Sequence, residues 1–320
     1  MIYKQIKGID KKVSALFYGT ASEAFLAGGD HNEILDAVVE TGINAIDTGR
    51  VYGNAEESLG KWLRARNNRS EMVLLSKCGH PDNATGADRI SEKEIRADFA
   101  VSSELLGTDY IDIYLLHRDN PAIPVGEIVE IMNALKQEGK IGIFGGSNWS
   151  TARIQEANAY AAAHGLDPFV VSSPSYGIAE QVKMPWIGVG ETLTGPKAAA
   201  DRAWYRDNDM PVLAYASLGH GMFSGRVKSD DPATAERFMD EFGCKGYAYP
   251  VNFETLARVE KMAQEKGVSV PALATAWLLH SDMNVFSIVS SMNVGRMKEN
   301  AAAADIVLTK EERDYLKTEA

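Results

Sequence analysis

The stretch Gly42-Ile-Asn-Ala-Ile-Asp47-Thr-Gly-Arg-Val-Tyr52-Gly joins a short apolar run to an acid and a tyrosine. The run stops abruptly at Asp47, and Tyr52 follows five residues later. A buried strand that carries a carboxylate to the edge of a sheet and then opens into a loop has this pattern. Two later strand-like runs also end in a proton-handling residue, at Lys77 and at His117. What the chain can do depends on whether these four side chains meet in space.

Short apolar runs alternate with helix-like stretches along the whole chain, with helix starts signalled by Asp30 as an N-cap and by the capping box Ser91-Glu-Lys-Glu94. Strands are expected at residues 15–18, 43–46, 72–76, 111–116, 141–144, 169–172, 211–215 and 285–289. Such an alternation implies parallel pairing with right-handed crossovers. Eight of these units in about 300 residues favour a closed (β/α)8 TIM barrel, an α/β fold, over an open doubly wound sheet.

Two segments depart from the strand–helix alternation. Residues 2–13 alternate apolar and polar positions around Gly8-Ile-Asp10, which predicts an N-terminal β-hairpin. Residues 216–252 are rich in Gly, Ser, Asp and Pro and are expected to form an extended loop over one face of the barrel. Because the composition shows no linker-like break, residues 1–320 are expected to form a single domain.

Composition and charge exclude several classes of protein. Charged residues make up 24% of the chain and the net charge is −11, which argues against nucleic acid as a partner because nucleic-acid binding requires a basic stripe. The two cysteines, Cys78 and Cys244, indicate a reducing compartment, and neither a signal peptide nor an apolar run of ~20 residues is apparent. We therefore expect a cytoplasmic protein without a membrane partner. The histidines are widely spaced and predict no metal site.

In a barrel, the residues that end these strands would lie at the same rim, because the active site of this fold is at the C-terminal ends of the strands. Adjacent strands lie ~4.8 Å apart, so Asp47, Lys77 and His117 can converge, with Tyr52 folded over them. Taken singly, Asp47 also fits a loop cap and His117 a core histidine. Lys77 is harder to explain in this way, since a lysine at the end of an apolar strand needs a counter-charge.

The chemistry that suits this cluster is proton transfer coupled to polarisation of a carbonyl. A free tyrosine, with a pKa near ~10, is a poor acid at neutral pH. The ammonium of Lys77 would lower the pKa of Tyr52, and Asp47 would hold Lys77 charged and in place. His117 would donate a second hydrogen bond to the oxygen on which negative charge develops.

The motifs Asp47-Thr-Gly-Arg-Val-Tyr52-Gly, Lys77, Leu-Leu-His117-Arg-Asp and Gly146-Ser147-Asn148 resemble those of the aldo-keto reductase superfamily, and the resemblance runs from Val13 to the final helix. It implies a (β/α)8 barrel that reduces aldehydes and ketones with NADPH, less often NADH, and without a metal. By the same resemblance Tyr52 is the general acid, Lys77 tunes it, Asp47 supports Lys77, and His117 orients the substrate carbonyl. Independently of the resemblance, Trp149 and Trp186 either line the substrate pocket or simply pack, and Trp149 is expected beside Tyr52 and His117 as a substrate contact.

The resemblance also implies a set of cofactor contacts. Ser147 and Asn148 match the pair that holds the nicotinamide carboxamide, and Tyr215 matches the aromatic residue that stacks on the nicotinamide ring. Ser173 stands where the family commonly has Gln, which weakens or replaces that contact. The remaining cofactor residues implied by the resemblance are Gly19, Thr20, Asp47, Ser217, Leu218, Gly219, Gly221, Ser224, Arg226, Ser291, Arg296, Glu299 and Asn300. The glycines and serines of residues 217–226 also suit close backbone approach to phosphate.

The adenosine end of the cofactor site departs from the family pattern. Ser290 and Met292 occupy or neighbour positions where relatives often have a Lys or Arg against the 2′-phosphate, although Arg296 and Ser291 remain available to contact it. NADPH is the preferred expectation, with NADH as the alternative. The partner is expected to be a small carbonyl compound, such as a sugar or sugar-derived carbonyl, and the sequence does not define the oligomeric state.

Two rival functions stay open at this point. Lys77 also suits the Schiff-base lysine of a barrel aldolase, although that function would leave Ser147, Asn148 and Tyr215 without a role. A non-catalytic subunit that senses NADP is the second rival, and retention of all four catalytic residue types argues against it. The loops that would set substrate choice carry no clear charge signature, and among them Arg118 and Arg226 either favour an anionic substrate or face solvent or cofactor.

Overall fold

The computed structural model describes residues 1–186 and 190–317, and a closed barrel of eight parallel strands forms its centre. In chain order these strands are β3 (Leu16–Gly19), β4 (Ala45–Asp47), β5 (Val73–Cys78), β6 (Ile111–Leu116), β7 (Ile141–Ser147), β8 (Val171–Ser173), β9 (Val212–Ala214) and β10 (Val285–Val289). The barrel closes where β10 pairs with β3, with Ser287 opposite Leu16. The predicted (β/α)8 barrel is confirmed.

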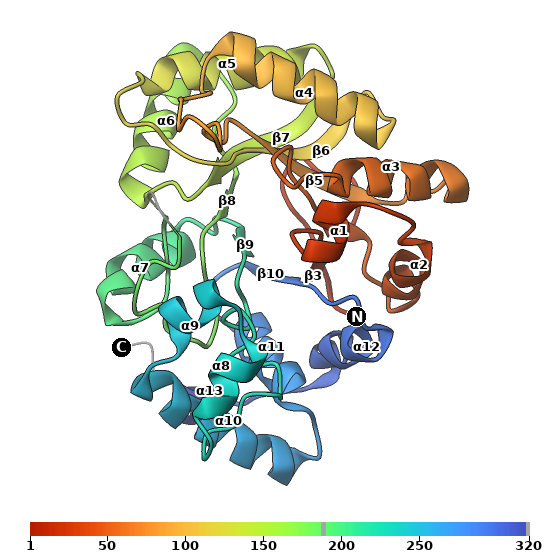
Figure 1. Ribbon diagram of the computed structural model, residues 1–320. Helices are drawn as coiled ribbons and strands as arrows, with labels where there is room; N and C mark the ends of the chain where they lie inside the picture. The colour runs from red at the N-terminus through yellow and green to blue at the C-terminus, as the bar shows by residue number, and fades with distance from the viewer. Residues whose placement is uncertain (187–189, 318–320) are drawn as a thin grey trace.

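Helices surround the strands and cover the outside of the barrel (Figure 1). The crossover helices are α2 (Asn32–Glu40), α3 (Ala55–Arg66), α4 (Glu92–Leu106), α5 (Val125–Gln137), α6 (Thr151–His164), α7 (Ala199–Asp207), α10 (Pro250–Lys266) and α11 (Val270–Leu279), and α12 (Val294–Ala301) follows the last strand. Most of them bury an apolar stripe against the strands, as Leu59, Trp62 and Leu63 do for α3. Parallel neighbouring strands require such crossovers, because a short turn cannot connect two strands that run in the same direction.

The structure adds short helices that the sequence did not predict. They are α1 (Glu23–Ala27), α8 (Ala233–Phe238), α9 (Glu241–Tyr247), α13 (Lys310–Leu316) and the 3-10 turns at Pro196–Ala198 and Ala302–Asp305. The segment 216–252 therefore contains α8 and α9 within its loops. Short helices of this kind carry too few turns for a clear periodic signal. At the start of α2 the N-cap is His31 rather than Asp30, whose carboxylate accepts from the backbone N–H of Asn32 at 2.9 Å.

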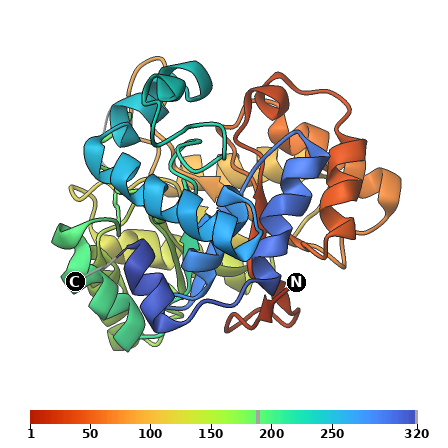
Figure 2. The same ribbon diagram turned by 90° about the horizontal axis from the view of Figure 1, so that it is seen from below.

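The predicted N-terminal hairpin is confirmed and closes one end of the barrel. Its strands β1 (Tyr3–Lys4) and β2 (Val13–Ser14) pair antiparallel, and Gly8 takes a left-handed φ of 89° in the connecting turn. Ile6 and Ile9 are buried in the same apolar cluster as the side chains that fill the barrel interior. Figure 2 shows the hairpin at the opposite end of the molecule from α8 and α9. The other end of the barrel, at which the strands have their C-terminal residues, is therefore the open one.

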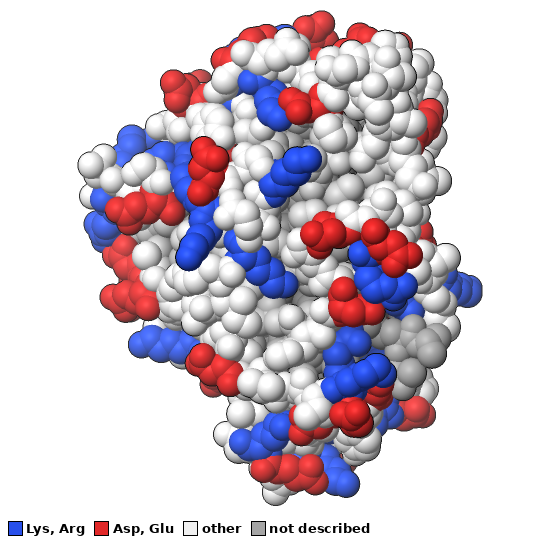
Figure 3. Space-filling view, turned by 180° about the vertical axis from the view of Figure 1, so that it is seen from behind, with Lys and Arg blue, Asp and Glu red and all other residues white. Residues whose placement is uncertain are grey.

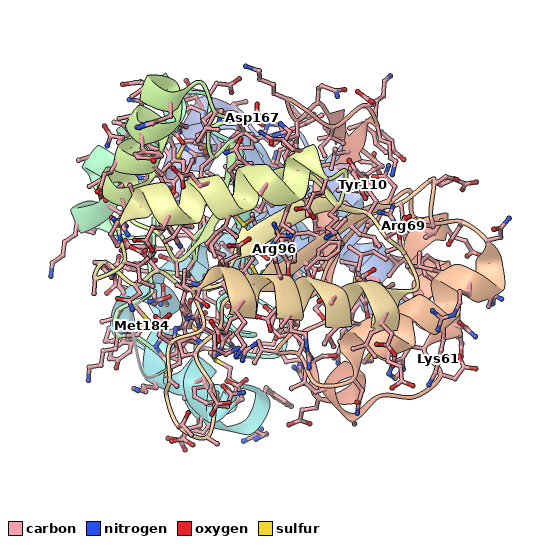
Figure 4. The ribbon with its side chains drawn as sticks, turned by 90° about the horizontal axis from the view of Figure 1, so that it is seen from above. Lys61, Arg69, Arg96, Tyr110, Asp167 and Met184 are labelled. Atoms are coloured by element: carbon pink, nitrogen blue, oxygen red, sulfur yellow. The ribbon has the colours of Figure 1, made fainter. Side chains whose placement is uncertain are left out.

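A buried carboxylate fastens the closed end of the barrel. Asp112 of β6 accepts from the backbone N–H of Leu74 at 3.0 Å and from the ammonium of Lys11 at 2.8 Å. The guanidinium of Arg69 lies 2.9 Å from the same carboxylate and also donates to the Tyr110 carbonyl, and Figure 4 shows Arg69 and Tyr110 side by side. Since a buried charge is tolerated only when it is paired and hydrogen-bonded, this network fixes the position of the hairpin against β5 and β6.

The outer surface carries charges of both signs. On the face shown in Figure 3, Lys and Arg side chains are interspersed with Asp and Glu. Arg96 on α4 is an example, because it bridges Glu92 on its own helix and Glu138 just beyond α5, and Figure 4 shows it between the two helices. Such exposed pairs contribute little to stability. None of the helices in residues 1–186 and 190–317 has both the length and the apolarity needed to cross a membrane.

Packing of α3 against α4 supplies a stability test at Gly60. A Cβ atom on this residue would lie 2.0 Å from the backbone oxygen of Leu105. Alanine normally favours a helix over glycine by ~1 kcal/mol, but here overpacking outweighs that gain. We expect Gly60→Ala to lower the free energy of unfolding in urea by roughly 1–3 kcal/mol. Lys61→Ala, on the exposed face of the same helix, serves as the control and changes it by less than about 0.5 kcal/mol. A more stable Gly60→Ala protein would contradict the packing described.

Candidate active site

The open end of the barrel contains a cavity of about 780 Å3 that brings together the four residues singled out from the sequence. Asp47 is the last residue of β4, Lys77 lies near the end of β5, and His117 follows β6 directly. Tyr52 lies in the turn between β4 and α3. All four side chains line the cavity, so the structure brings them together at one rim of the barrel, as expected from the strand ends.

A buried ion pair between Asp47 and Lys77 forms the floor of this cavity. The ammonium of Lys77 donates to the carboxylate of Asp47 and, at 2.8 Å, to the carbonyl of Thr48, and both side chains are almost fully buried. Burial lowers the pKa of Lys77, but the negative charge of Asp47 and the proximity of Tyr52 outweigh burial and raise it overall. Lys77 is therefore a fixed cation.

Tyr52 lies above this pair. Its ring centroid is 4.9 Å from the Lys77 ammonium and 5.5 Å from the centroid of the His117 ring, which it meets edge to face. Burial raises the pKa of Tyr52, and the charge of Lys77 opposes that rise without cancelling it. The expected lowering by Lys77 is present, but burial is the larger effect. The phenol is consequently protonated at neutral pH, the state that a proton donor requires.

His117 is held as a neutral imidazole. Burial lowers its pKa well below the usual value, and the positive charges of Lys77 and Arg118 lower it further. The backbone N–H of His117 donates to the Cys78 carbonyl at 2.7 Å, which fixes the residue against β5. Its Nδ1 has no hydrogen-bond partner among the described residues. A neutral imidazole beside Tyr52 can donate a hydrogen bond without losing a proton.

A hydrogen-bonded network of polar side chains forms the wall beside this cluster. Tyr215 donates through its hydroxyl to the Asn148 side-chain carbonyl at 2.7 Å, and the Asn148 amide donates to the Ser147 hydroxyl at 3.1 Å. Asn148 has a left-handed φ of 60°, which turns the chain away from β7 at this point. Ser173 lines the cavity, but its hydroxyl donates to the Leu213 carbonyl at 2.8 Å, so this hydroxyl is used within the barrel wall.

Two arginines face the other end of the cavity. Arg226 follows β9 in the chain and Arg296 lies in α12, and both line the cavity. Burial lowers the pKa of Arg226, and the nearby charge of Arg296 lowers it further. Neither guanidinium has an acidic partner within residues 1–186 and 190–317. Ser217, Leu218, Gly221, Ser224, Ser291 and Asn300 also line the cavity, and their role as cofactor contacts stays a prediction. Two close cations without counter-ions form a site for anionic groups.

Four predicted site residues lie outside the cavity lining. Thr20 is fully buried and its hydroxyl donates to the backbone carbonyl of Asp47 at 3.0 Å, so it supports Asp47 from behind. Gly219 is buried in a turn, and Glu299 points to the exposed side of α12.

Trp149, which was expected to contact substrate, is only 1% exposed. Its indole donates to the Arg118 carbonyl at 3.2 Å and packs against Phe169, which places it in the wall behind the cavity.

The cavity also has lining residues that sequence reasoning did not assign to the site. They come from loops after several strands and from the excursion with α8 and α9: Ser22, Glu23, His80, His220, Phe238 and Asp240. Arg118 and Trp186, for which the sequence left a pocket position as one of several alternatives, also line the cavity. The side chains from α8 and α9 could not be placed, since no strand end fixes the register of that segment. No cluster of three or more His, Cys, Asp or Glu residues suited to a metal occurs in the described chain.

Comparison with known proteins places this site in context. A profile of the Aldo/keto reductase family matches residues 15–318. The chain is 28% identical over 309 residues to "Aldo-keto reductase str7" of Strobilurus tenacellus, covering 95% of this chain and 84% of the relative. It is 28% identical over 295 residues to "Norsolorinic acid reductase A" of Aspergillus parasiticus, covering 87% and 68%. It is 26% identical over 304 residues to yakc, a Schizosaccharomyces pombe aldo-keto reductase whose name specifies NADP(+), covering 91% and 81%.

The lowered pKa of His117 predicts a pH dependence of stability. The folded-state pKa lies below the ~6.5 of an unfolded histidine, so the unfolded chain binds more protons and stability falls as the pH drops below about 6.5. Over each pH unit in which His117 is protonated only in the unfolded chain, the free energy of unfolding falls by about 1.4 kcal/mol. We expect His117→Gln to lose less unfolding free energy than the wild type between pH 7 and pH 5. Urea titrations at several pH values measure this.

The control for that comparison is His164→Gln, because His164 is exposed at the end of α6. This variant is expected to follow the wild-type pH dependence. Parallel curves for the wild type and His117→Gln would show that the imidazole is not held neutral by its surroundings.

Proposed function

The chain belongs to the aldo/keto reductase family, and we propose that it reduces an aldehyde or ketone to the alcohol with NADPH as hydride donor. The observation that carries the proposal is the meeting of Tyr52, Lys77, Asp47 and His117 at one end of a cavity large enough for a substrate beside a cofactor. A protonated phenol, a fixed cation and a neutral imidazole together supply a proton and stabilise negative charge on a carbonyl oxygen.

The residues at the two ends of the cavity suit a dinucleotide. Arg226 and Arg296 lack acidic partners among the described residues and offer donors to phosphate groups. Gly221 borders the cavity with a left-handed φ of 98°, and a Cβ there would meet no atom closer than 3.8 Å. The backbone conformation, rather than a lack of space, therefore favours glycine at this position. At the catalytic end, Asn148 orients the Tyr215 hydroxyl, which fixes that ring as a platform for the nicotinamide. The pair of arginines favours NADPH over NADH, because the 2′-phosphate needs additional cationic contacts.

In the proposed reaction the bound cofactor supplies a hydride to the carbonyl carbon. Tyr52 gives its phenolic proton to the carbonyl oxygen as negative charge develops there, and the alcohol forms. His117 donates a hydrogen bond to the same oxygen and aligns the carbonyl. Lys77, held charged by Asp47, stabilises the phenolate that Tyr52 becomes. Transfer of a proton back to Tyr52 from solvent completes the cycle.

The two rival functions are less well supported. A Schiff-base aldolase needs an unprotonated lysine, whereas the pKa of Lys77 is raised and its ammonium is bound to Asp47. Borohydride trapping with a carbonyl substrate tests this rival, and a stable adduct at Lys77 would favour it. A subunit that only senses the nucleotide would bind NADPH without consuming it, so oxidation of NADPH in the presence of a panel of aldehydes, ketones and sugars separates the two cases.

Replacement of the proposed acid provides a direct test. Tyr52→Phe removes the proton donor and retains the ring, so we expect turnover to fall at least about a hundredfold, within the usual ~10²–10⁴ contribution of general acid catalysis. NADPH affinity, measured by fluorescence titration, should stay within about threefold of wild type, because the phosphate contacts lie elsewhere. Tyr315→Phe, at an exposed position on α13, is the matched control and should retain wild-type turnover. Undiminished turnover in Tyr52→Phe would overturn the assignment.

The cofactor preference is tested at α12. Arg296→Leu removes a charge-assisted contact to phosphate, so we expect the dissociation constant for NADPH to rise about tenfold or more and that for NADH to change much less. Lys298→Leu removes a cation from the same helix at an exposed position outside the cavity lining and should leave both constants near wild type. Equal losses for the two cofactors would place Arg296 on a phosphate that NADPH and NADH share.

A further inference from the structure

The substrate end of the cavity contains a cation whose charge nothing in the described chain balances. Arg118 is half-buried and lines the cavity. Burial lowers its pKa, and the groups that oppose this effect are Tyr215 and Tyr52, with no carboxylate among them. The neighbouring acid, Asp119, is bound by Arg153 instead. A partly desolvated guanidinium without an anionic partner is unfavourable, and it therefore marks a place where an anion binds.

The guanidinium of Arg118 is held in position and keeps most of its donors free. Its Nη1 donates to the His117 carbonyl at 3.0 Å. Its backbone carbonyl accepts from the Trp149 indole at 3.2 Å, which gives Trp149 a role in fixing this residue. A guanidinium has five N–H donors, so one bond to the backbone leaves a fork that matches a carboxylate in geometry.

Arg118 is separate from the cations that suit the cofactor. Arg226 and Arg296 influence one another and lie at the end of the cavity formed by β10, α12 and the loop after β9. Arg118 follows β6 and instead acts on Tyr52, His117 and Tyr215, the groups around the proposed reaction centre. Because the proposed function assigns the phosphates of NADPH to Arg226 and Arg296, we expect the counter-ion of Arg118 to come from a different molecule.

We infer that Arg118 selects a substrate that carries a carboxylate in addition to the aldehyde or ketone, an inference that rests on the proposed function. A single guanidinium without a second cation matches the single charge of a carboxylate better than a phosphate dianion. In the same cavity, Trp186 and His220 lie with ring centroids 5.8 Å apart, and neither ring is taken up by the proposed nicotinamide site. This aromatic wall suits an aromatic ring between the two groups. The substrate class is thus an aromatic aldehyde or ketone bearing a carboxylate.

The test compares acids with their neutral esters. Steady-state rates with NADPH are measured for 3- and 4-carboxybenzaldehyde against the corresponding methyl formylbenzoates, and for glyceraldehyde 3-phosphate against glyceraldehyde. We expect kcat/KM for at least one carboxybenzaldehyde to exceed that for its ester about 30-fold or more, mostly through KM, as for loss of one partner of a desolvated charge pair. A ratio near one for both isomers overturns the inference, and a larger preference for the phosphorylated aldehyde overturns the assignment to carboxylates.

Variants then assign the preference to Arg118. In Arg118→Met the ratio of acid to ester should fall to near one, and Arg118→Lys should restore part of it because the charge returns without the fork. Arg206→Met, which removes an exposed arginine paired with Asp207 and Asp282 on the outside of the barrel, should keep the wild-type ratio. An unchanged ratio in Arg118→Met overturns the role of this residue.

A binding measurement separates failure of this inference from failure of the proposed function. Benzoate and benzamide are titrated calorimetrically into the protein saturated with NADP+. Tighter binding of benzoate that disappears in Arg118→Met supports the anion site even if no carbonyl compound is turned over, in which case only the proposed reaction fails. Turnover of neutral aldehydes together with equal affinity for benzoate and benzamide overturns the anion site and leaves the reductase function intact.

Discussion

The buried ion pair between Asp47 and Lys77 is the interaction on which the rest of the site depends. Each charge alone would be costly at this depth, and only their mutual contact and hydrogen bonds make them tolerable. The barrel brings them together because β4 and β5 are parallel neighbours whose C-terminal ends meet at the same rim. Thr20 supports the backbone of Asp47 from behind. With Lys77 fixed as a cation, Tyr52 has a positive charge 4.9 Å from its ring centroid, which opposes the rise that burial causes in its pKa.

The same cation also determines the state of the neighbouring histidine. Burial together with the positive charges of Lys77 and Arg118 keeps His117 neutral, so that Tyr52 is the one group of the pair suited to give up a proton. Further positive charge lies at the other end of the cavity, on Arg226 and Arg296. A chain with a net charge of −11 thus places in one pocket three arginines that have no acidic partner among the described residues. This distribution suits a dianionic or more highly charged cofactor at one end and an anionic substituent at the other.

The sequence predicted those parts of the structure that local pattern determines. Strand ends placed Asp47, Lys77 and His117, because a parallel barrel brings the C-terminal residues of its strands to one rim. Prediction from the sequence was wrong where the direction of a loop side chain determines whether the residue reaches the cavity. Trp149 follows β7 closely, yet it turns into the wall behind Arg118 rather than into the cavity. Phe238 and Asp240 reach the cavity from a segment whose path depends on tertiary packing, and no periodicity in that segment indicates its position.

Hydride transfer to a carbonyl carbon in this pocket can be followed with a labelled cofactor. NADPH that carries two deuterium atoms at C4 is supplied together with a carbonyl substrate that the protein turns over. Mass spectrometry and proton NMR of the product then locate the label. We expect one deuterium on the carbon that bears the new hydroxyl group, with one equivalent of cofactor oxidised. An alcohol without deuterium, or a product formed without cofactor oxidation, would contradict it.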